Sequence, residues 1–344
     1  MSTVRIAIIG AGLIGRTHIN VIRQEWRCEV AAIADPMPAA ATLASEQGVP
    51  YFADYTAMLD SVKPDGAIIA TPNALHAPAA LACAERGVHM LVEKPIADTI
   101  EAAQSIVGAA DRAGVALLVG HHRRFNPFIQ KTRDIIQGGR IGRLVAVNSI
   151  YLLQKPDPYF DVTWRREAGG GPVLINLIHD IDDLRFICGE ISTLQAISSN
   201  SVRGFAVEDT AAIIVGFANG ALGTLTVSDT AATPWNWEMN VGENPFFPRQ
   251  TENCYYFGGT EGGLSVPKME LWHYPGEKGW GAPFSRETIE VTPADPYVQQ
   301  IRHFCRVILG EEKPFITGAD GARTLAATLA VNKAAKTGTS VQLK

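Results

Sequence analysis

The feature that most constrains this chain is an apolar run that leads directly into a glycine motif. Residues Val4–Ile9 are followed by Gly-Ala-Gly-Leu-Ile-Gly at positions 10–15. In such a strand–turn–helix unit, the glycines permit a tight turn, close approach of backbone to a pyrophosphate, and close packing of the helix on the strand. The helix N-terminus adds unpaired N–H groups that attract the anion. The motif predicts a dinucleotide site formed by Gly10, Gly12, Leu13, Ile14 and Gly15.

An acidic residue follows at the distance that such a site requires. A second apolar run, Val30–Ala34, ends at Asp35, about twenty residues after the last glycine, where a carboxylate binds a ribose 2′-hydroxyl. The same carboxylate would repel the 2′-phosphate of NADP, and the next residue is Pro36 rather than an arginine. We therefore predict that Asp35 contacts the cofactor and that NAD is favoured over NADP.

The composition excludes several classes of protein. The chain has 344 residues, which suffices for two domains, and a net charge of −5, which argues against nucleic acid as a partner. Its five cysteines are scattered without a Cys-x-x-Cys pair, so we expect neither a zinc site nor a disulfide framework. There is no bilayer-length apolar run and no signal segment. We expect a cytoplasmic protein with no metal and no membrane partner.

The first third of the chain alternates apolar runs with alanine-rich helical patterns. This alternation predicts an α/β domain, a Rossmann doubly wound parallel sheet that binds NAD(P), over residues 1–122. Its expected strands are Val4–Ile9, Val30–Ala34, Gly66–Ala70, His89–Val92 and Ala116–Val119.

The remainder, residues 123–344, consists mostly of segments with period-two hydrophobicity, such as Leu144–Leu153 and Ala211–Phe217. One helix, Val173–Cys188, is inserted among them, and two late helices close the chain. This order predicts an α+β domain with a large, mostly antiparallel open sheet and helices on one face. We expect this domain to bind the substrate, and its uncovered sheet face to pair with another copy in a homodimer or homotetramer.

Polar residues follow two of the expected parallel strands, at the edge where such sheets bind ligands. The first group is predicted to lie near the cofactor, although it also suits a simple turn that starts a helix. It comprises Thr71, Pro72, Asn73 and His76.

The second group is the tripeptide Glu93-Lys94-Pro95, which follows the strand His89–Val92. A lysine in a desolvated position can lose its proton near neutral pH and then serve as an acid/base. We predict that Glu93 and Lys94 contact the cofactor and that Lys94 also contacts the substrate; the alternative is an ion pair at the surface.

Adjacent histidines follow the fifth strand. Neighbouring residues in an extended segment point in opposite directions, so His121 and His122 are not expected to bind one metal ion together. We predict that His122 faces the cofactor. Arg123 is predicted to bind the substrate, or else to pair with carboxylates between the domains.

The helix Val173–Cys188 carries short polar residues opposite its apolar stripe: Asn176, His179, Asp180 and Asp183. Solvated helix faces are usually built from longer residues with better helix propensity, so this face is predicted to line a cleft. His179 is the natural acid/base, and Asn176 is expected to bind the substrate. A capped helix and a metal site are alternatives, but no motif supplies a third metal ligand.

Aromatic residues cluster at two further places. Trp164 and Arg165 precede a glycine-rich turn and are predicted to lie near the cofactor, whereas Trp235 is predicted to contact the substrate. Such side chains stack on sugar rings, but they also concentrate at subunit interfaces.

These motifs together resemble the Gfo/Idh/MocA oxidoreductases, a family that includes glucose-fructose oxidoreductase and myo-inositol 2-dehydrogenase. The resemblance spans essentially the whole chain. It is carried by the glycine motif, residues 71–76, Glu93-Lys94-Pro95, residues 120–125, the glycines 169–171 that lead to His179, and residues 259–262 and 300–304.

The resemblance implies a dehydrogenase for a sugar, a cyclic polyol or a related hydroxy compound, with Lys94 and His179 as the acid/base pair. The family often has an aspartate four residues before the histidine, where this chain has Ile175. Asp180 or Asp183 would then have to substitute. Two alternatives are a glycoside-cleaving enzyme that uses NAD in a transient oxidation, and a dinucleotide-binding protein without catalysis.

Overall fold

The computed structural model describes residues 3–244 and 246–343, and these form two compact units. One unit is Met1–His122 with Asp295–Leu325, and the other is Arg123–Ala294 with Ala326–Lys344. The first break lies between His122 and Arg123, at the predicted boundary. Residues Asp295–Leu325 were expected in the second domain, but they belong to the first unit because they pack on its sheet.

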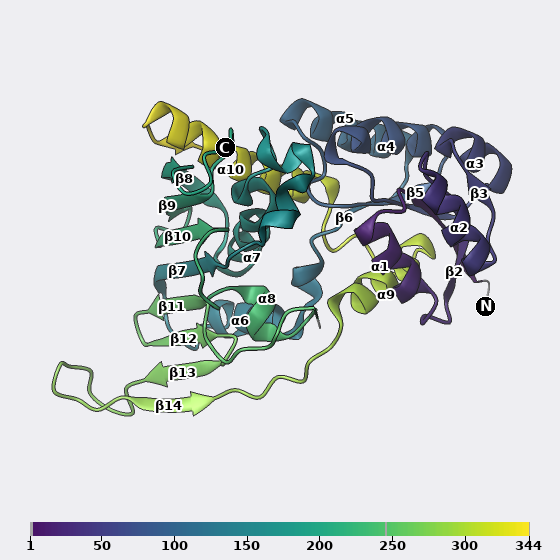
Figure 1. Ribbon diagram of the computed structural model, residues 1–344. Helices are drawn as coiled ribbons and strands as arrows, with labels where there is room; N and C mark the ends of the chain where they lie inside the picture. Colours follow the sequence, from purple (N-terminus) through teal and green to yellow (C-terminus); the bar gives the residue numbers. More distant parts are fainter. Residues whose placement is uncertain (1–2, 245, 344) are drawn as a thin grey trace. The chain divides into compact units, whose positions relative to one another are not determined.

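The first unit is built on six parallel strands in the order β3-β2-β1-β4-β5-β6 (Figure 1). This is the strand order of a dinucleotide-binding fold, and it confirms the predicted doubly wound sheet. The strands are β1 (Val4–Ile9), β2 (Cys28–Ala34), β3 (Tyr51–Phe52), β4 (Gly66–Ile69), β5 (His89–Val92) and β6 (Leu117–Val119). The two-residue strand β3 was not predicted, because so short a segment shows no periodicity.

Helices connect these strands and cover the sheet. They are α1 (Leu13–Ile22), α2 (Pro38–Gln47), α3 (Tyr55–Val62), α4 (His76–Glu85), α5 (Ile100–Ala113) and the late helix α9 (Pro296–Ile308). Helix α9 joins this core through Phe304, which is fully buried. A Cβ atom on Gly66 would lie 3.0 Å from the Phe304 ring, so the glycine makes room for the helix.

The second unit contains a nine-stranded sheet in the order β14-β13-β12-β11-β7-β10-β9-β8-β15. Neighbouring strands are antiparallel except for β7 and β10, which are parallel. The strands are β7 (Leu144–Leu152), β8 (Ile191–Ser199), β9 (Thr210–Phe217), β10 (Leu222–Ser228), β11 (Tyr255–Gly259), β12 (Gly262–Val266), β13 (Glu270–His273), β14 (Ser285–Thr288) and β15 (Val341–Gln342). The predicted large, mostly antiparallel sheet is confirmed.

One face of this sheet forms a core with helices. The helices of the second unit are α6 (Pro127–Gln137), a π-helical turn at Val173–Leu177 that leads into α7 (Ile178–Cys188), α8 (Trp237–Val241), and the later part of α10 (Gly318–Thr337). The inward side chains of β7, β9 and β10 pack in one cluster with Ile181, Leu184 and Val331. None of the helices described is long and apolar enough to span a membrane.

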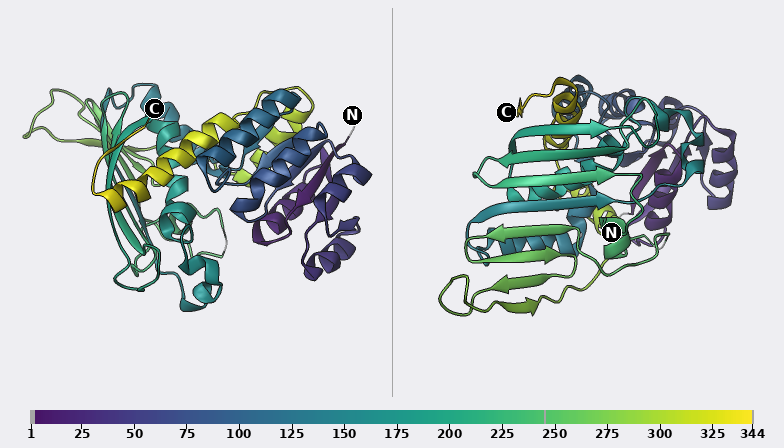
Figure 2. Two further views of the ribbon diagram at one scale, coloured as in Figure 1. Left: turned by 90° about the horizontal axis from the view of Figure 1, so that it is seen from above. Right: turned by 60° about the vertical axis from the view of Figure 1, so that its left-hand side comes forward.

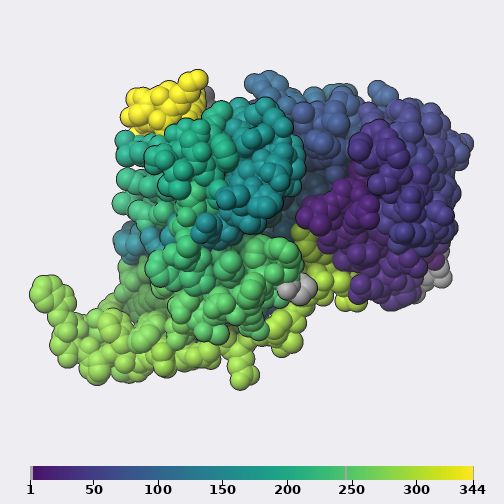
Figure 3. All heavy atoms as spheres, in the orientation of Figure 1, coloured from purple at the N-terminus to yellow at the C-terminus, as the bar shows by residue number. Residues whose placement is uncertain are grey.

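The other face of the sheet is open. Figure 2 shows its strands uncovered in the right-hand view. Its outward side chains include large apolar ones: Ile197, Ile214 and Leu222 are 76%, 57% and 64% exposed. The connection between β13 and β14 projects from the unit (Figure 3) and carries the fully exposed Trp280. Exposed apolar side chains of this size on an open sheet face are typical of an interaction surface.

Candidate functional site

The glycine loop has the conformation that a dinucleotide site requires. Gly10 has a φ of +96°, and a Cβ atom there would lie 2.6 Å from the Ala70 carbonyl oxygen. A Cβ atom on Gly15 would lie 2.0 Å from the Gly10 oxygen, whereas one on Gly12 would meet nothing within 4 Å. Neither Gly10 nor Gly15 can therefore carry a side chain without rearrangement, and Gly12 faces open space.

The N-terminus of α1 and the adjacent β4 loop present groups suited to a bound ligand. Gly12 is the N-cap of α1, and no side chain caps that end of the helix. The first N–H groups of α1 are thus available to an anion. Among the described residues, the buried Thr71 hydroxyl has no hydrogen-bond partner, which is the state expected of a group that a ligand satisfies. The loop therefore fits a dinucleotide pyrophosphate.

Asp35 lies beside this loop, at the end of β2. One carboxylate oxygen accepts a hydrogen bond from the Ala11 N–H at 2.7 Å, and the other accepts one from the Met37 N–H at 2.8 Å. The side chain is partly exposed, and each carboxylate oxygen has lone pairs left for further donors. Asp35 can therefore order the glycine loop and accept hydrogen bonds from ribose hydroxyls at the same time.

His76 connects the two predicted loops of the first unit. It is buried, and its ring nitrogens lie 2.8 Å from the Thr71 carbonyl oxygen and 2.9 Å from the Pro95 carbonyl oxygen. Burial lowers the pKa of His76, which favours the neutral ring. His76 therefore links the Thr71 loop to the Glu-Lys-Pro segment, and its contact with the cofactor stays a prediction. Pro72 and Asn73 lie at the partly exposed start of that loop.

Glu93 is buried, and its carboxylate holds the segment that carries Lys94. Its Oε1 lies 2.7 Å from Nε2 of the buried His18 in α1, and its Oε2 accepts a hydrogen bond from the Lys94 N–H at 3.2 Å. Burial acts to raise the pKa of Glu93, but the hydrogen bond from His18 and the charge of Lys94 outweigh it, so the pKa is lowered. Glu93 is therefore a buried anion, not the partner in a surface ion pair.

Sequence reasoning missed two residues that contact the predicted site residues of the first unit, His18 and Tyr297. His18 lies in α1, after the glycine motif, and Tyr297 lies in α9, far away in the sequence. The Tyr297 ring stacks on His122, with centroids 4.2 Å apart, and meets His18 edge-on at 5.7 Å. The buried His122 thus packs against α9, and the half-buried Lys94 follows a carboxylate fixed by His18.

In the second unit, a π-helical turn precedes His179. The predicted single helix is divided into the turn Val173–Leu177 and α7, and π turns are frequent at functional sites. The Asn176 side chain lies in this turn, where its oxygen accepts a hydrogen bond from Lys155 at 2.7 Å and its nitrogen donates one to the Tyr151 hydroxyl at 2.8 Å. His179 itself is largely buried, three residues later.

Lys155 is a third residue that sequence reasoning missed, because it lies in no recognisable motif. It follows β7, and its ammonium lies 3.6 Å from an Asp229 oxygen and 4.8 Å from the centre of the Tyr159 ring. Burial lowers the pKa of Lys155 to about 8. A cationic group that exchanges its proton near neutral pH therefore lies next to Asn176.

Arg123 lies inside the second unit, where it neutralises a group of buried carboxylates. It is 2% exposed, and its guanidinium lies 2.6 Å from Glu238, 3.5 Å from Asp183 and 3.7 Å from Asp180. Arg123 thus pairs with carboxylates of its own unit rather than with carboxylates between the domains, and its contact with a substrate stays a prediction.

Asp180 and Asp183, two of the three aspartates of α7, do not line a cleft as predicted. Both are fully buried; Asp180 accepts hydrogen bonds from Tyr255 at 2.8 Å and Ser149 at 3.2 Å, and an Asp183 oxygen lies 3.2 Å from the same Tyr255 hydroxyl. These bonds direct the two carboxylates toward Arg123 and the sheet. That one of them replaces the aspartate absent at Ile175 stays a prediction, and the Asn176 side chain, three residues before His179, is hydrogen-bonded to Lys155.

Trp164 and Arg165 lie in a 3₁₀ turn, Thr163–Arg166, and Trp235 lies in the loop before α8. Trp164 and Trp235 are half exposed, and the Arg165 guanidinium lies 3.9 Å from the centre of the Tyr159 ring while donating a hydrogen bond to the Tyr159 carbonyl at 2.7 Å. Trp164 and Trp235 thus remain accessible to a ligand, and Arg165 is fixed by its own loop. No group of three or more His, Cys, Asp or Glu side chains suited to a metal ion occurs among residues 3–244 and 246–343.

Comparison with known proteins agrees with this geometry. A family model described as an oxidoreductase family with an NAD-binding Rossmann fold matches residues 4–121, and the C-terminal domain model of the same family matches residues 129–265. The first unit is thus an NAD-binding domain, and the chain is a member of a family of enzymes.

Relatives extend the match over the full length. The chain is 29% identical to 1,5-anhydro-D-fructose reductase of Ensifer adhaerens over 99% of this chain and 98% of that protein. It is 30% identical to inositol 2-dehydrogenase 2 of Saccharopolyspora erythraea over 64% of this chain and 65% of that protein. The WlbA dehydrogenase of Bordetella pertussis, solved with NADH and UDP-GlcNAcA, is 25% identical with a TM-score of 0.84, covering 100% of this chain and 99% of that chain.

The Arg123 network generates a prediction about stability. Burial raises the pKa of Asp180 to about 6 and of Glu243 to about 7 even with Arg123 present. The folded chain thus binds these protons more tightly than the unfolded chain, and this contribution to stability declines as the pH rises through 6 to 7. Arg123→Met should lower the free energy of unfolding by about 3–5 kcal/mol at pH 8, and by less at pH 5, where Asp180 and Glu243 are protonated.

Denaturant unfolding at both pH values measures this effect. Arg286→Met is the matched control, because its ion pair with Glu270 is exposed and should contribute about 1 kcal/mol or less. An equal loss for Arg123→Met at pH 5 and pH 8 would show that the carboxylates do not depend on this guanidinium.

Proposed function

This chain belongs to the Gfo/Idh/MocA family of oxidoreductases, and we propose that it oxidises a hydroxyl carbon of a sugar or cyclic polyol, or reduces the corresponding carbonyl, with Lys94 and His179 as its acid/base residues. The observation that carries the proposal is the placement of Lys94. It directly follows Glu93, a buried carboxylate that His18 holds in place at 2.7 Å, and it lies just after β5, whose neighbour β4 leads to Thr71. Parallel sheets bind ligands at this edge.

In this proposal, residues of the first unit bind the cofactor. The α1 N-terminus and glycine loop would hold the pyrophosphate, Asp35 the ribose, and the Thr71 hydroxyl an adjoining part of the cofactor. NAD, when bound, supplies the hydride acceptor or donor. Since a carboxylate at Asp35 disfavours a 2′-phosphate, NAD is the proposed cofactor.

Side chains of this protein accept and return the proton of the substrate hydroxyl. The Lys94 amine, once deprotonated, accepts the proton of the substrate hydroxyl in oxidation and returns it in reduction. His179 is the second acid/base, and Asn176, oriented by Lys155 and Tyr151, is proposed to bind another substrate hydroxyl. Trp235 is accessible for stacking on the ring of a sugar or polyol.

Two other functions are compatible with the same fold. A glycoside-cleaving enzyme would oxidise its substrate only transiently and show no net reduction of NAD. A protein that only binds the dinucleotide would not need the lysine that follows Glu93. The names of the relatives, a reductase and dehydrogenases of sugar-like compounds, favour the net oxidoreductase.

The open sheet face supports a proposal about assembly. A second copy pairing on this face would bury Ile197, Ile214 and Leu222, which are more than half exposed in one chain. We propose a homodimer or homotetramer formed through this face of the second unit, since leaving these three apolar side chains in water is costly.

A screen of cyclic polyols, aldoses, anhydrosugars and sugar acids with NAD tests the proposed reaction. We expect at least one compound to produce NADH, measured by absorbance, in an amount equal to the substrate consumed. With that compound, Lys94→Met should retain NAD binding and lose at least about 99% of turnover, since a positioned acid/base contributes 10²–10⁴-fold. Lys131→Met, at an exposed position on α6, is the control and should remain active.

Three results would contradict this account. Release of a sugar without net NADH formation would favour the glycoside-cleaving enzyme. Binding of NAD without turnover of any compound class would favour the non-catalytic protein. Turnover by Lys94→Met at most of the original rate would remove Lys94 from the chemistry.

Light scattering at micromolar concentration tests the proposed assembly. The chain should have the mass of two or four copies, and Ile214→Glu should shift it toward one copy because a buried, unpaired carboxylate is unfavourable at the interface. Lys131→Glu on the helical side of the second unit should leave the mass unchanged. A monomeric wild-type chain would be incompatible with pairing through the open face.

A further inference from the structure

The start of the segment that leads to His179 is held by a carboxylate from a distant part of the chain. Glu208, in the connection between β8 and β9, accepts a hydrogen bond from the Val173 N–H at 3.0 Å. Val173 is the first residue of the π turn and is fully buried, so water does not reach this N–H. The preceding residue, Pro172, has no side-chain acceptor that could cap the turn. Glu208 therefore supplies the acceptor that the first N–H of a buried helical segment requires.

The glycine-rich turn before Val173 has room for this carboxylate only because position 171 has no side chain. A Cβ atom on Gly171 would lie 2.3 Å from Oε1 of Glu208 and 2.8 Å from its Oε2. Gly171 does not have the left-handed φ of Gly169, which is +89°, so its backbone conformation is open to other residues. The need for glycine at position 171 therefore comes from the Glu208 side chain.

The connection that carries Glu208 is itself held in place. Asp209, the next residue, is buried and accepts a hydrogen bond from the Arg203 N–H at 3.0 Å. The Arg203 guanidinium donates to the Lys155 carbonyl oxygen at 2.9 Å, and the Lys155 ammonium donates to the Asn176 side chain at 2.7 Å. The π turn is thus attached to this connection directly at its first residue, and through Lys155 at Asn176.

We propose that Glu208 is a positioning residue for the oxidoreductase reaction: it fixes where the π turn begins, and so where Asn176 and His179 point. This role rests on the proposed function, in which Asn176 binds a substrate hydroxyl and His179 exchanges a proton. Successive residues of an α-helix are about 100° apart around its axis, so a start displaced by one residue would turn both side chains away from their places. Glu208 acts through the Val173 N–H and needs no contact with the substrate.

The proposed role requires the hydrogen bond from Val173 rather than the charge of Glu208. Burial raises the pKa of Glu208, and the hydrogen bond from the Val173 N–H only partly offsets this effect. The amide oxygen of a glutamine can accept the same hydrogen bond without a charge. Glu208→Gln therefore keeps the contact, whereas Glu208→Ala removes it and Gly171→Ala displaces the carboxylate while leaving every polar group in the chain.

Steady-state kinetics with a compound that the wild-type chain oxidises tests this role. Glu208→Ala and Gly171→Ala should each lower kcat about 10- to 100-fold with NAD binding unchanged, because small misplacements of reacting groups are costly. Glu208→Gln should keep most of kcat. The double variant should lose no more than Glu208→Ala alone, since the three atoms nearest to the added methyl group all belong to Glu208.

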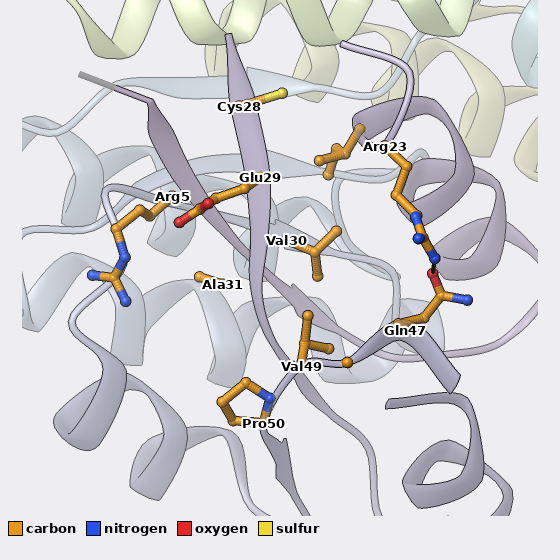
Figure 4. A pocket seen from close by; sticks show the side chains of 11 residues that line it. Arg5, Arg23, Cys28, Glu29, Val30, Ala31, Gln47, Val49 and Pro50 are labelled. Atoms are coloured by element: carbon orange, nitrogen blue, oxygen red, sulfur yellow. Dashed lines mark hydrogen bonds between the residues drawn. The ribbon is translucent and has the colours of Figure 1, made fainter. Parts of the chain in front are cut away.

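An exposed carboxylate of the first unit provides the matched control. Glu29 is the second residue of β2, whereas Asp35 follows the last residue of that strand. Figure 4 shows Glu29 at a surface pocket of about 430 Å³. Glu29→Ala should leave both kcat and NAD binding unchanged.

Hydrogen exchange measured by mass spectrometry tests the contact without any substrate. The amides of the π turn should exchange faster in Glu208→Ala and Gly171→Ala than in the wild type, because local opening becomes less costly. In Glu208→Gln they should exchange at the wild-type rate. A wild-type chain that forms no NADH would contradict the proposed function, whereas exchange still decides whether Glu208 holds the turn.

The positioning role of Glu208 is overturned by any of several outcomes. Wild-type kcat or wild-type exchange in Gly171→Ala would do so even where Glu208→Ala fails to fold. A double variant whose loss is the product of the two single losses would show that Gly171 and Glu208 act independently. Equal losses of kcat in Glu208→Gln and Glu208→Ala would show that the charge acts, and not the contact with Val173.

Discussion

The hydrogen bond between the Ala11 N–H and the Asp35 carboxylate is the contact on which the functional interpretation depends. At 2.7 Å it joins the glycine loop to the end of β2, so the loop conformation and the acidic group are set by one interaction. This loop conformation requires glycine at positions 10 and 15, because a side chain at either position would clash with nearby backbone atoms. The result is a helix N-terminus and a carboxylate placed side by side, which match the pyrophosphate and ribose of NAD.

From α1 the arrangement continues to the proposed acid/base. His18 of that helix holds the Glu93 carboxylate, and Lys94 is the next residue. His76 ties the following Pro95 to the loop of Thr71. A buried carboxylate is costly unless it is fully paired, so its presence here fixes one conformation of the segment. The second unit also contains buried carboxylates that are paired with a cation: Arg123 lies next to Asp183 of α7 and to Glu238.

Much of this structure could be predicted from the sequence, because its signals are local. The parallel strands are continuous apolar runs, and the glycine motif with Asp35 specifies its own geometry. The contacts that were missed are between residues distant in the chain: His18 with Glu93, Tyr297 with His122, and Lys155 with Asn176. Periodicity on α7 identified its polar residues but could not show that Asp180 and Asp183 face Arg123. The membership of Asp295–Leu325 in the first unit likewise depends on packing, through Phe304 and Gly66.

The central claim is that the glycine loop and Asp35 hold NAD, and calorimetric titration of the purified chain with NAD and with NADP tests it most directly. The account predicts that NAD binds more tightly than NADP by about tenfold or more, because the Asp35 carboxylate accepts hydrogen bonds from ribose hydroxyls and repels a 2′-phosphate. Tighter binding of NADP, or binding of neither dinucleotide, would contradict it.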